Sequence, residues 1–347
     1  MEGAEAALVC PGMDVVAFCK QSRVLVVAGK GGVGKTTTCA ALARAGAQAG
    51  LDVLVIELEG RRGLPAAFSS DDRLHYTETV LAASGEALDG AFSGGQVGAG
   101  SRSGAVKARW ITPDDALLEY LGEHGLQRIS KRLVSSGALD VVSTAVPGIK
   151  DILVLGKVKQ LERAAAADLI IVDAPATGHA FTFLSSARGL LDAVRAGPVR
   201  SQAAEVTELL TDPARCRVLL VTLPEEMPIN EAVESANRLE HDLGMSLAAV
   251  VVNGVYPELD WLDLDPTVLA ATAGMVLEPG EAEALREAAR FRLARQQLQS
   301  SEMARLAEQL PLPQLPLPAL FATDVGVAEL QRLASALALG IETLVVQ

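Results

Sequence analysis

Short apolar runs alternate with longer stretches of helical pattern along most of this chain. The runs are strand-sized and rich in valine, leucine and isoleucine, which is typical of strands buried on both faces of a parallel sheet. They cover Val24–Ala28, Val53–Glu57, Leu169–Val172, Arg217–Thr222, Leu247–Val252 and Gln314–Leu317, the last as an edge strand. Helical patterns such as Asn230–Asp242 lie between several of them. This alternation predicts an α/β fold with a mostly parallel, doubly wound sheet and helices on both faces.

Three segments depart from the alternation. Residues 84–103 are rich in Gly, Ser and Ala, which predicts a flexible surface loop. Thr112 and Pro113 then form a helix start, with Thr112 as the N-cap and Pro113 at the first helical position. The helical pattern continues from Asp114 to Ala164, with a break at Pro147-Gly148, and a second helical stretch covers Glu281–Gln309.

A glycine-rich octamer follows the first predicted strand. It reads Gly29-Lys30-Gly31-Gly32-Val33-Gly34-Lys35-Thr36 and fits the pattern G-x-x-x-x-G-K-[ST]. The alanine-rich helical pattern of Thr37–Gln48 comes next, so the octamer has the strand and helix context of a phosphate-binding loop. Its glycines let backbone N–H groups turn towards phosphates at a helix N-terminus, whose dipole favours negative charge. The sequence therefore predicts that residues 29–37 bind a nucleoside triphosphate.

Two side chains of this loop and one aspartate have expected roles at the triphosphate. Lys35 is expected to reach the β- and γ-phosphates, and the Thr36 hydroxyl to hold Mg²⁺. The apolar run at 169–172 ends in Asp173, which can bind the magnesium shell or orient water beside the γ-phosphate. Pro175 and Gly178 follow and allow two loop conformations, as a phosphate-sensing switch requires. The expected cofactors are thus ATP and Mg²⁺, with Thr36 and Asp173 at the metal.

The chain length agrees with one large P-loop domain. We expect residues 20–347 to form a single ATPase domain in which segments 112–165 and 281–310 contribute a helical subdomain. Half of the residues are hydrophobic and only 3% are aromatic, so aliphatic side chains are expected to form the core.

Composition excludes several classes of partner. The net charge of −13 argues against nucleic acid and against an anionic membrane surface. The chain has neither a signal-peptide pattern nor an apolar run long enough to span a bilayer, so we expect a cytoplasmic protein without stable membrane insertion. Its four cysteines are scattered and include no Cys-x-x-Cys pair, so we expect no zinc clamp.

The motifs resemble those of the ArsA / GET-pathway ATPases, the arsenite-pump and tail-anchored-protein targeting family. The loop matches K-G-G-x-G-K-[ST], the deviant P-loop of the SIMIBI NTPases. Asp173 to His179, with Phe183-Leu184, resembles D-T-A-P-T-G-H-x-x-R-F-L; Pro147–Asp151 resembles P-G-I-D-E; and Val250–Asn253 resembles the strand-terminal V-V-N. The resemblance covers roughly residues 24–338 without the Gly/Ser loop. It implies that Lys30 crosses a dimer interface to the partner's nucleotide, and that Asn253 hydrogen-bonds the purine edge.

The first switch loop departs from the family pattern. Family members have D-P-A-H after the second strand, and their aspartate positions the attacking water. Here Glu59 takes the place of the aspartate and Gly60 that of the proline, followed by Arg61 and Arg62. Glu59 is the expected counterpart, although a misplacement of about 1 Å can cost on the order of 100-fold in rate. Arg61 and Arg62 are candidates for charge stabilisation or ordinary loop residues.

The resemblance favours a slowly hydrolysing, Mg-ATP-dependent dimeric switch with Lys30, Lys35, Glu59 and Asp173 as its catalytic residues. It is closest to bacterial single-domain members labelled anion-transporting ATPases, some of which occur as paired paralogues. The dimer can therefore be a homodimer or a heterodimer with a paralogous subunit. A hydrophobic client protein is a further expected partner, with candidate contacts on the helical segment at Leu117, Leu118, Leu121, Leu126, Ile129, Leu133, Ile149, Ile152, Leu153 and Leu155, all of which can also be core residues.

Two alternatives remain open. One is a partner subunit that binds nucleotide but hydrolyses it weakly, because the switch I aspartate is replaced. The other is a partition or cell-division type of deviant P-loop ATPase, which needs a basic amphipathic helix or a basic face. The C-terminal residues 337–347 contain no basic side chain.

Overall fold

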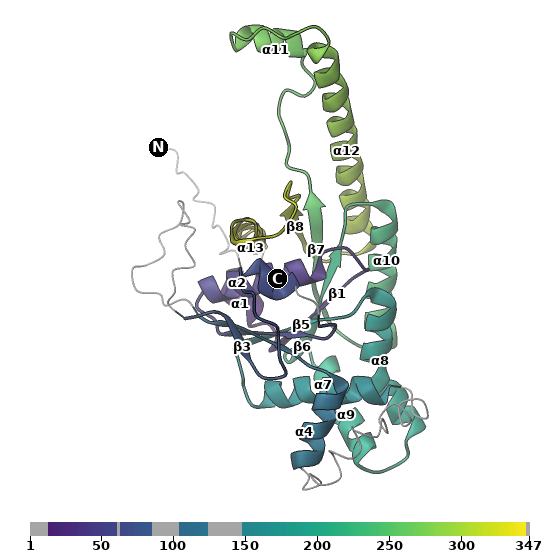
Figure 1. Ribbon diagram of the computed structural model, residues 1–347. Helices are drawn as coiled ribbons and strands as arrows, with labels where there is room; N and C mark the ends of the chain where they lie inside the picture. The colour runs from purple at the N-terminus through teal and green to yellow at the C-terminus, as the bar shows by residue number, and fades with distance from the viewer. Residues whose placement is uncertain (1–12, 61–62, 85–103, 124–147, 345–347) are drawn as a thin grey trace, which may run out of the picture.

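An eight-stranded sheet forms the centre of the molecule (Figure 1). The computed structural model describes residues 13–60, 63–84, 104–123 and 148–344. Over these residues the sheet order is β3-β4-β2-β5-β1-β6-β7-β8, and among the described strands only β3 runs antiparallel to its neighbour. The strands are β1 Val24–Ala28, β2 Val53–Glu57, β3 Thr79–Ala82, β4 Val106–Trp110, β5 Leu169–Asp173, β6 Cys216–Thr222, β7 Leu247–Val255 and β8 Gln314–Pro318.

All six predicted strands are present, and the predicted fold class is confirmed. The strands β3 and β4 were missed by the sequence analysis. Lys107 and Arg109 interrupt the apolar pattern of β4, yet Arg109 is buried because its guanidinium lies over the Tyr76 ring and donates to the Tyr76 carbonyl. Such contacts with a residue distant in sequence partner a charge inside a strand but leave no pattern in the sequence.

One face of the sheet is covered by α2 (Lys35–Gln48) and α13 (Val327–Glu342), which pack on each other. The short helices α1 (Val15–Cys19) and α3 (Gly63–Ala67) complete this layer. The apolar face of α13 is buried in the same core as α2. The odd-numbered residues of β2 and β5 point into this layer, because side chains alternate along a strand.

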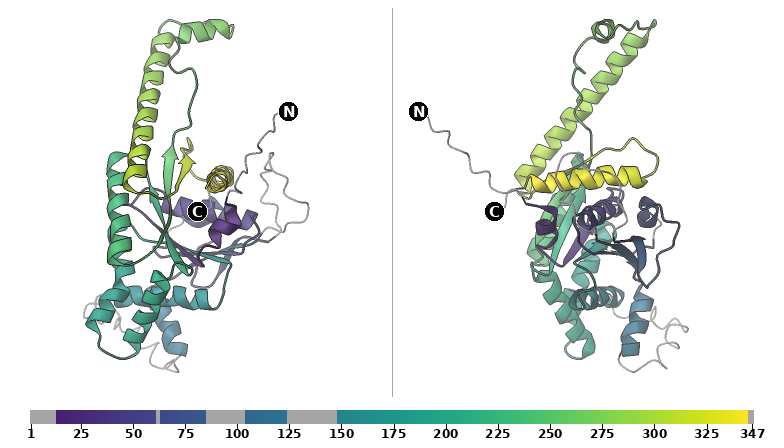
Figure 2. Two further views of the ribbon diagram at one scale, coloured as in Figure 1. Left: turned by 180° about the vertical axis from the view of Figure 1, so that it is seen from behind. Right: turned by 90° about the vertical axis from the view of Figure 1, so that its left-hand side faces the viewer.

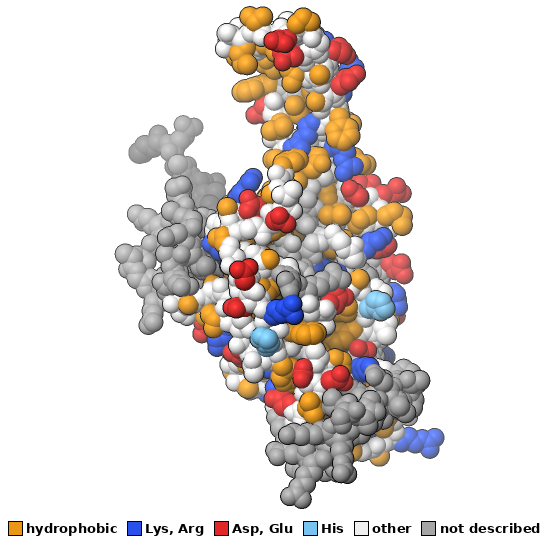
Figure 3. Space-filling view, viewed as in Figure 1, with side chains coloured by type: hydrophobic (Ala, Val, Ile, Leu, Met, Phe, Trp, Pro, Cys, Tyr) orange, Lys and Arg blue, Asp and Glu red, His pale blue; other side chains and the backbone are white. Residues whose placement is uncertain are grey.

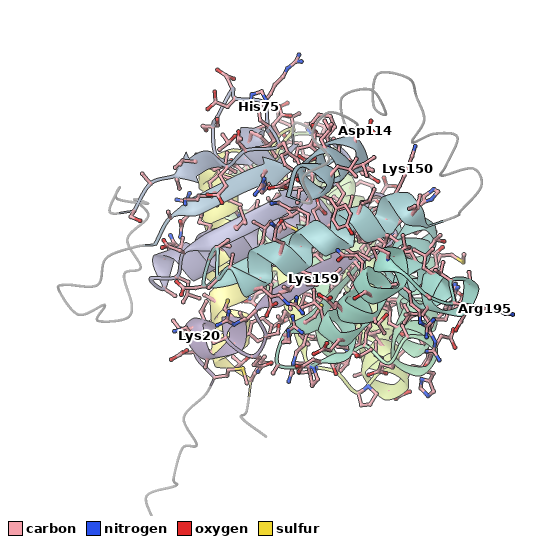
Figure 4. All side chains as sticks on the ribbon, turned by 90° about the horizontal axis from the view of Figure 1, so that it is seen from below. Lys20, His75, Asp114, Lys150, Lys159 and Arg195 are labelled. Atoms are coloured by element: carbon pink, nitrogen blue, oxygen red, sulfur yellow. The ribbon has the colours of Figure 1, made fainter. Side chains whose placement is uncertain are left out.

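The other face is covered by α7 (Ile149–Arg163), α8 (Thr177–Ala193), α9 (Pro198–Thr211) and α10 (Glu226–Asn237), which continues as the π-helix η1 (Arg238–Asp242). Helix α4 (Pro113–Glu123) packs on α7. Figure 4 looks at this layer from below, with Lys150 near the start of α7 and Lys159 further along it. Lys159 donates to Gln202 and Glu205 of α9, which fixes α7 against α9.

A helical arm rises from the sheet beyond β7 (Figures 1 and 2). We define it as residues 256–298, which include α11 (Pro266–Thr272) and most of α12 (Glu281–Gln309). Its root is fixed where Gln299, Glu302 and Leu306 are buried. Above the root it exposes apolar side chains, seen as orange patches in Figure 3: Leu259, Trp261, Leu264, Val268, Met275, Val276, Leu285, Phe291 and Leu298.

The helical segments fit the predictions in part. The backbone N–H of Asp115 donates to Thr112 Oγ1 at 3.2 Å, which confirms the predicted N-cap before α4. However, α4 and α7 lie below the sheet whereas α12 rises above it, so we assign the two segments to separate layers rather than to one subdomain. The predicted Gly/Ser loop lies outside the described residues from position 85 to 103. Among the helices that the structure describes, none has the length and apolarity needed to cross a membrane.

The candidate client residues of segment 114–164 divide by burial. Ile152 and Leu155 are core residues beneath α7, and Leu117, Leu118, Leu121, Ile149 and Leu153 are half-buried. Leu126, Ile129 and Leu133 lie outside the described residues.

We expect Leu155→Ala to lower the free energy of unfolding by about 2–5 kcal/mol, because it leaves a cavity beneath α7. Leu285→Ala on the exposed arm is the control and should change it by less than about 0.5 kcal/mol. Urea unfolding followed by circular dichroism measures both, and equal effects would contradict the assignment of Leu155 to the core.

Candidate functional site

The glycine loop lies between the end of β1 and the start of α2, at the carboxyl edge of the sheet. Two of its glycines have no room for a side chain. A Cβ at Gly29 would lie 2.2 Å from the carbonyl oxygen of Val221 in β6. Gly34 has a φ of +94°, and a Cβ there would lie 2.3 Å from Nδ2 of Asn253. The loop is therefore held close to the ends of β6 and β7, with the N-terminus of α2 directed at its centre.

Three predicted site residues come together at this N-terminus. Thr36 Oγ1 donates to Asp173 Oδ2 at 2.6 Å, which joins the first turn of α2 to the end of β5. Lys35 Nζ donates to the carbonyl of Lys30 at 3.1 Å, so its ammonium is folded back over the loop. Burial raises the pKa of the Asp173 carboxyl, opposed mainly by the hydrogen bond from Thr36 and the charge of Lys35.

The residues present fit a magnesium ion. Oδ1 of Asp173 is buried and has no hydrogen-bond partner among the described residues, although Oδ2 is bonded to Thr36. A hydroxyl and a carboxylate side by side are the hard oxygen donors that Mg²⁺ prefers. They line a cavity of about 180 Å³ together with Gly32, Gly34, Lys35, Thr37, Glu57, Glu59 and Ala174. Asp173 thus has an oxygen available for a cation or its bound water.

The two glutamates of the first switch lie in different environments. Glu57 is the last residue of β2 and is 1% exposed, whereas Glu59 lies beyond the strand and is exposed. Both line the cavity. Gly60 is covered by the Trp110 indole, since a Cβ there would lie 2.8 Å from two ring carbons. Arg61 and Arg62 lie outside the described residues.

Sequence reasoning missed Glu57. The residue ends an apolar run, and the family resemblance places the functional carboxylate two positions later, at Glu59. The signal that identifies it is structural: an acidic residue is rarely fully buried at a strand end unless it has a partner or a ligand. The burial itself, however, appears only in the structure.

Asn253 and Lys30 lie on either side of the loop. Asn253 Nδ2 donates to the Val33 carbonyl at 2.9 Å, so its amide braces the loop next to the place expected for the purine. Lys30 Nζ pairs with Glu231 of α10 at 2.6 Å, with side-chain exposures of 42% and 33%. Sequence reasoning found no partner for Lys30 within the chain, since nothing in the sequence relates two residues so far apart.

Comparison with known proteins agrees with this geometry. The model of the CobQ/CobB/MinD/ParA nucleotide binding domain matches residues 24–340. The chain is 33% identical to ATPase BagA of Mycobacterium tuberculosis over 258 residues, which covers 72% of this chain and 69% of that protein. It is 30% identical over 220 residues to an arsenical pump-driving ATPase of Escherichia coli, covering 62% of this chain and 32% of that protein.

A parallel α/β sheet with a glycine loop, a lysine, a threonine and a strand-terminal aspartate at its carboxyl edge defines a nucleotide-binding protein of the P-loop class. The chain belongs to the family of CobQ/CobB/MinD/ParA nucleotide-binding domains. This family relationship supports the nucleotide-binding prediction for the loop, and the relatives named ATPase support nucleotide hydrolysis in general terms.

We expect Asp173→Asn to raise the melting temperature of the metal-free protein near pH 7.5. The raised pKa means that folding disfavours the ionised carboxylate, and this penalty is present above the folded-state pKa and disappears as the pH falls below it. The difference between variant and wild type should therefore shrink in acid.

In the same variant, adding Mg²⁺ to the ATP-bound protein should raise the melting temperature much less than it does in the wild type. Thermal scans with ATP in EDTA and with ATP in Mg²⁺ measure this directly. If Mg²⁺ raised the melting temperature of ATP-bound Asp173→Asn as much as that of the wild type, Asp173 would not belong to the metal site.

Proposed function

We propose that this chain is a Mg-ATP-binding, slowly hydrolysing ATPase that acts as a dimeric switch of the ArsA / GET-pathway type. The observation that carries the proposal is the hydrogen bond from Thr36 to Asp173, formed beside Lys35 at the N-terminus of α2. It brings the phosphate loop into contact with Asp173 at the end of β5, where the second switch loop, residues 173–179, begins. Loss or gain of a γ-phosphate at that point would change the contacts of both the phosphate loop and the loop that follows β5.

The site residues would have separate roles in binding phosphate, metal, purine and water. The loop N–H groups and Lys35 bind the β- and γ-phosphates and stabilise the charge that develops there. Thr36 and Asp173 hold the metal, which neutralises phosphate charge when it is bound. Asn253 would offer its amide to the purine edge. Glu59 would position the attacking water from the edge of the cavity that it lines, although its side chain lies beyond the end of β2 and is exposed.

Lys30 supports the dimeric part of the proposal. Its ion pair with Glu231 is half-exposed, and such surface pairs contribute only about 0–1 kcal/mol. Lys30 can therefore leave Glu231 at a low cost in free energy and bind a phosphate of the nucleotide in a second subunit. Lys30 would then be held within its own chain in the open state and released on closure.

Two alternatives stay under test. A hydrolysis-weak partner subunit of a paralogous ATPase is favoured by the exposed Glu59 in the place of the family aspartate. A membrane-bound partition or cell-division role is disfavoured, because the apolar face of the C-terminal helix α13 is already buried against α2. The helix would have to leave the core in order to lie on a membrane.

A hydrophobic client or a partner subunit would gain most from covering the arm, where apolar side chains are exposed (Figure 3). The segment 114–164 offers less apolar surface, since its candidate residues in the described part of the chain are buried or half-buried. We therefore propose the arm as the first place to look for a partner.

We expect Lys35→Ala to weaken ATP binding by about 100-fold, because a hydrogen-bonded charge contributes up to about 3 kcal/mol. Calorimetry measures the affinity, and a single-turnover assay of the wild type measures hydrolysis. Lys107→Ala, which loses a lysine on the surface of β4, is the control. Unchanged affinity in Lys35→Ala would refute the site, and tight binding without any hydrolysis would leave only the partner-subunit alternative.

We expect Lys30→Ala to keep ATP affinity within about threefold but to lower single-turnover hydrolysis and ATP-dependent dimerisation by about tenfold or more. Glu231→Gln should strengthen ATP-dependent dimerisation by up to about fivefold, because it removes a competing pair of at most about 1 kcal/mol. Sedimentation with and without Mg-ATP measures both. If neither variant differs from wild type, Lys30 is an ordinary surface lysine.

A further inference from the structure

The end of the helical arm has an apolar surface that its own packing does not cover. We call residues 257–283 the tip of the arm; they include α11 and the start of α12 (Figure 1). The tip has a small interior, because α11 packs on α12, Pro266 is buried and Leu262 and Leu269 are half-buried. Six other large apolar side chains of the tip are between 46% and 95% exposed: Leu259, Trp261, Leu264, Val268, Met275 and Val276.

Trp261 is the largest of these side chains and is 69% exposed. Its φ of +66° lies in the left-handed region, which residues other than glycine rarely occupy and which is common at binding sites. The backbone N–H of Leu264 donates to the Trp261 carbonyl at 3.1 Å, so a turn holds the residue in this conformation. Tryptophan is among the residues that contribute most to binding at the centre of interfaces. The tip thus presents a fixed aromatic side chain to solvent.

The tip is also strongly acidic. Residues 257–283 contain seven aspartates and glutamates and no lysine, arginine or histidine, so their charge is −7, compared with −13 for the whole chain. Arg286, just below the tip, pairs with Asp265 and Glu283. Four other acidic residues are exposed and form no ion pair within the described part of the chain: Glu258, Asp260, Asp263 and Glu278. Acidic and apolar side chains therefore share one surface, seen in red and orange around α11 in Figure 3.

This combination of charge and apolarity decides between possible occupants. A second copy would bring another tip of charge −7, and like charges that face each other disfavour contact. An anionic membrane surface attracts basic segments and repels acidic ones. A purely apolar segment would remove water from the carboxylates without giving them partners. An amphipathic helix whose apolar stripe is flanked by lysine or arginine matches both kinds of side chain.

We propose that the tip of the arm is a docking surface for a basic amphipathic helix of a partner protein. The apolar stripe of that helix covers Trp261 and the apolar side chains around it, and its basic residues lie beside Asp260 and Asp263. The inference rests on the proposed function, since it names the chemistry of the partner that the arm would bind. Helix α11 is about 10 Å long, so a partner helix of three or four turns is long enough to cover it.

The chain carries a reporter for this interaction, because Trp261 is one of only two tryptophans. In the Trp110→Phe variant, the fluorescence of Trp261 measures binding of a synthetic helical peptide of leucine and lysine, about five turns long, with leucine along one face. The emission should shift to shorter wavelength as the indole is covered. A leucine–glutamate peptide with the same apolar face should bind at least about tenfold more weakly, and added salt should weaken the lysine peptide, because screening reduces the attraction between opposite charges.

Calorimetry on the otherwise unchanged chain tests the apolar part of the surface with the same lysine peptide. Trp261→Ala should weaken binding by about tenfold or more, as loss of a central interface residue does. Leu339→Ala, which removes an exposed apolar side chain of α13, is the control and should leave binding unchanged. All of these side chains are exposed, so the melting temperatures should stay close to that of the wild type.

A second set of variants tests the charges. Asp260→Asn combined with Asp263→Asn should weaken binding of the lysine peptide by about three- to tenfold at low salt and make it less sensitive to salt. Glu234→Gln combined with Glu240→Gln removes the same charge from exposed positions off the arm, in α10 and η1, and should have little effect.

Equal affinity for the lysine and glutamate peptides would overturn the proposal, and so would wild-type binding in Trp261→Ala. Two other outcomes would replace the partner helix with another occupant. Binding to vesicles of phosphatidylcholine and phosphatidylglycerol that is lost in Trp261→Ala would indicate a membrane surface, and self-association that is lost in the same variant would indicate a second copy. The peptide measurements need no nucleotide, whereas calorimetry with ATP tests the glycine loop. A chain that bound the peptide but no ATP would therefore refute the proposed function and leave the docking surface intact.

Discussion

The junction between the glycine loop, α2 and β5 is the constraint on which the site depends. Gly29 and Gly34 let the loop approach β6 and Asn253 to distances that no other residue allows, and the hydrogen bond from Thr36 to Asp173 then fixes the first turn of α2 on the sheet. The first turn of α2, the ammonium of Lys35 and the buried carboxylates face one cavity as a result. A shift of α2 along its axis would move its first turn and Lys35 away from the carboxylates on the sheet. The stability of α2 in the core, where its alanines are fully buried, therefore preserves the geometry of the site.

The sequence was sufficient for the parts of this arrangement that follow from local pattern. Five buried apolar strands and the edge strand β8 could be read from hydrophobicity, and the glycine loop from its spacing. The sequence pattern could not predict which charged side chains are buried. Arg109 in β4, Glu57 at the end of β2 and the partner of Lys30 all depend on contacts between segments distant in sequence, and each is the kind of polar exception that hydrophobic patterns cannot anticipate. The long helix α12 of the arm could be predicted from its pattern, but neither α11 nor the projection of the arm from the sheet, because that direction depends on where the root is anchored.

Both switch loops are in contact with the helical layer below the sheet. On the first, Gly60 lies under the Trp110 indole, and Trp110 is followed within three residues by α4. On the second, α8 contacts the start of α7, where a Cβ at Gly148 would lie 3.1 Å from the Ser186 side chain. Helices α4 and α7 are in turn joined by the ion pair of Lys157 with Glu119, which also accepts from the Tyr76 hydroxyl. Under the proposed switch function, a displacement of either loop would therefore act on the same pair of helices, α4 and α7.

The arm is connected to the nucleotide loop on the opposite side. Asn253 braces the loop at Val33, and the next residue, Gly254, accepts a hydrogen bond from Gln299 of α12. Gln299 also accepts from the backbone of Tyr256, so the root of the arm is tied to both sides of the strand end. Helix α10, which holds Glu231 against Lys30, packs on α12 as well. The lysine expected to cross a dimer interface, the asparagine expected at the purine and the exposed apolar arm are thus joined through one short stretch of β7, α10 and α12. These contacts are hydrogen bonds and packing rather than a flexible linker. Under the proposed switch function, a change in loop position would therefore act on the root of the arm.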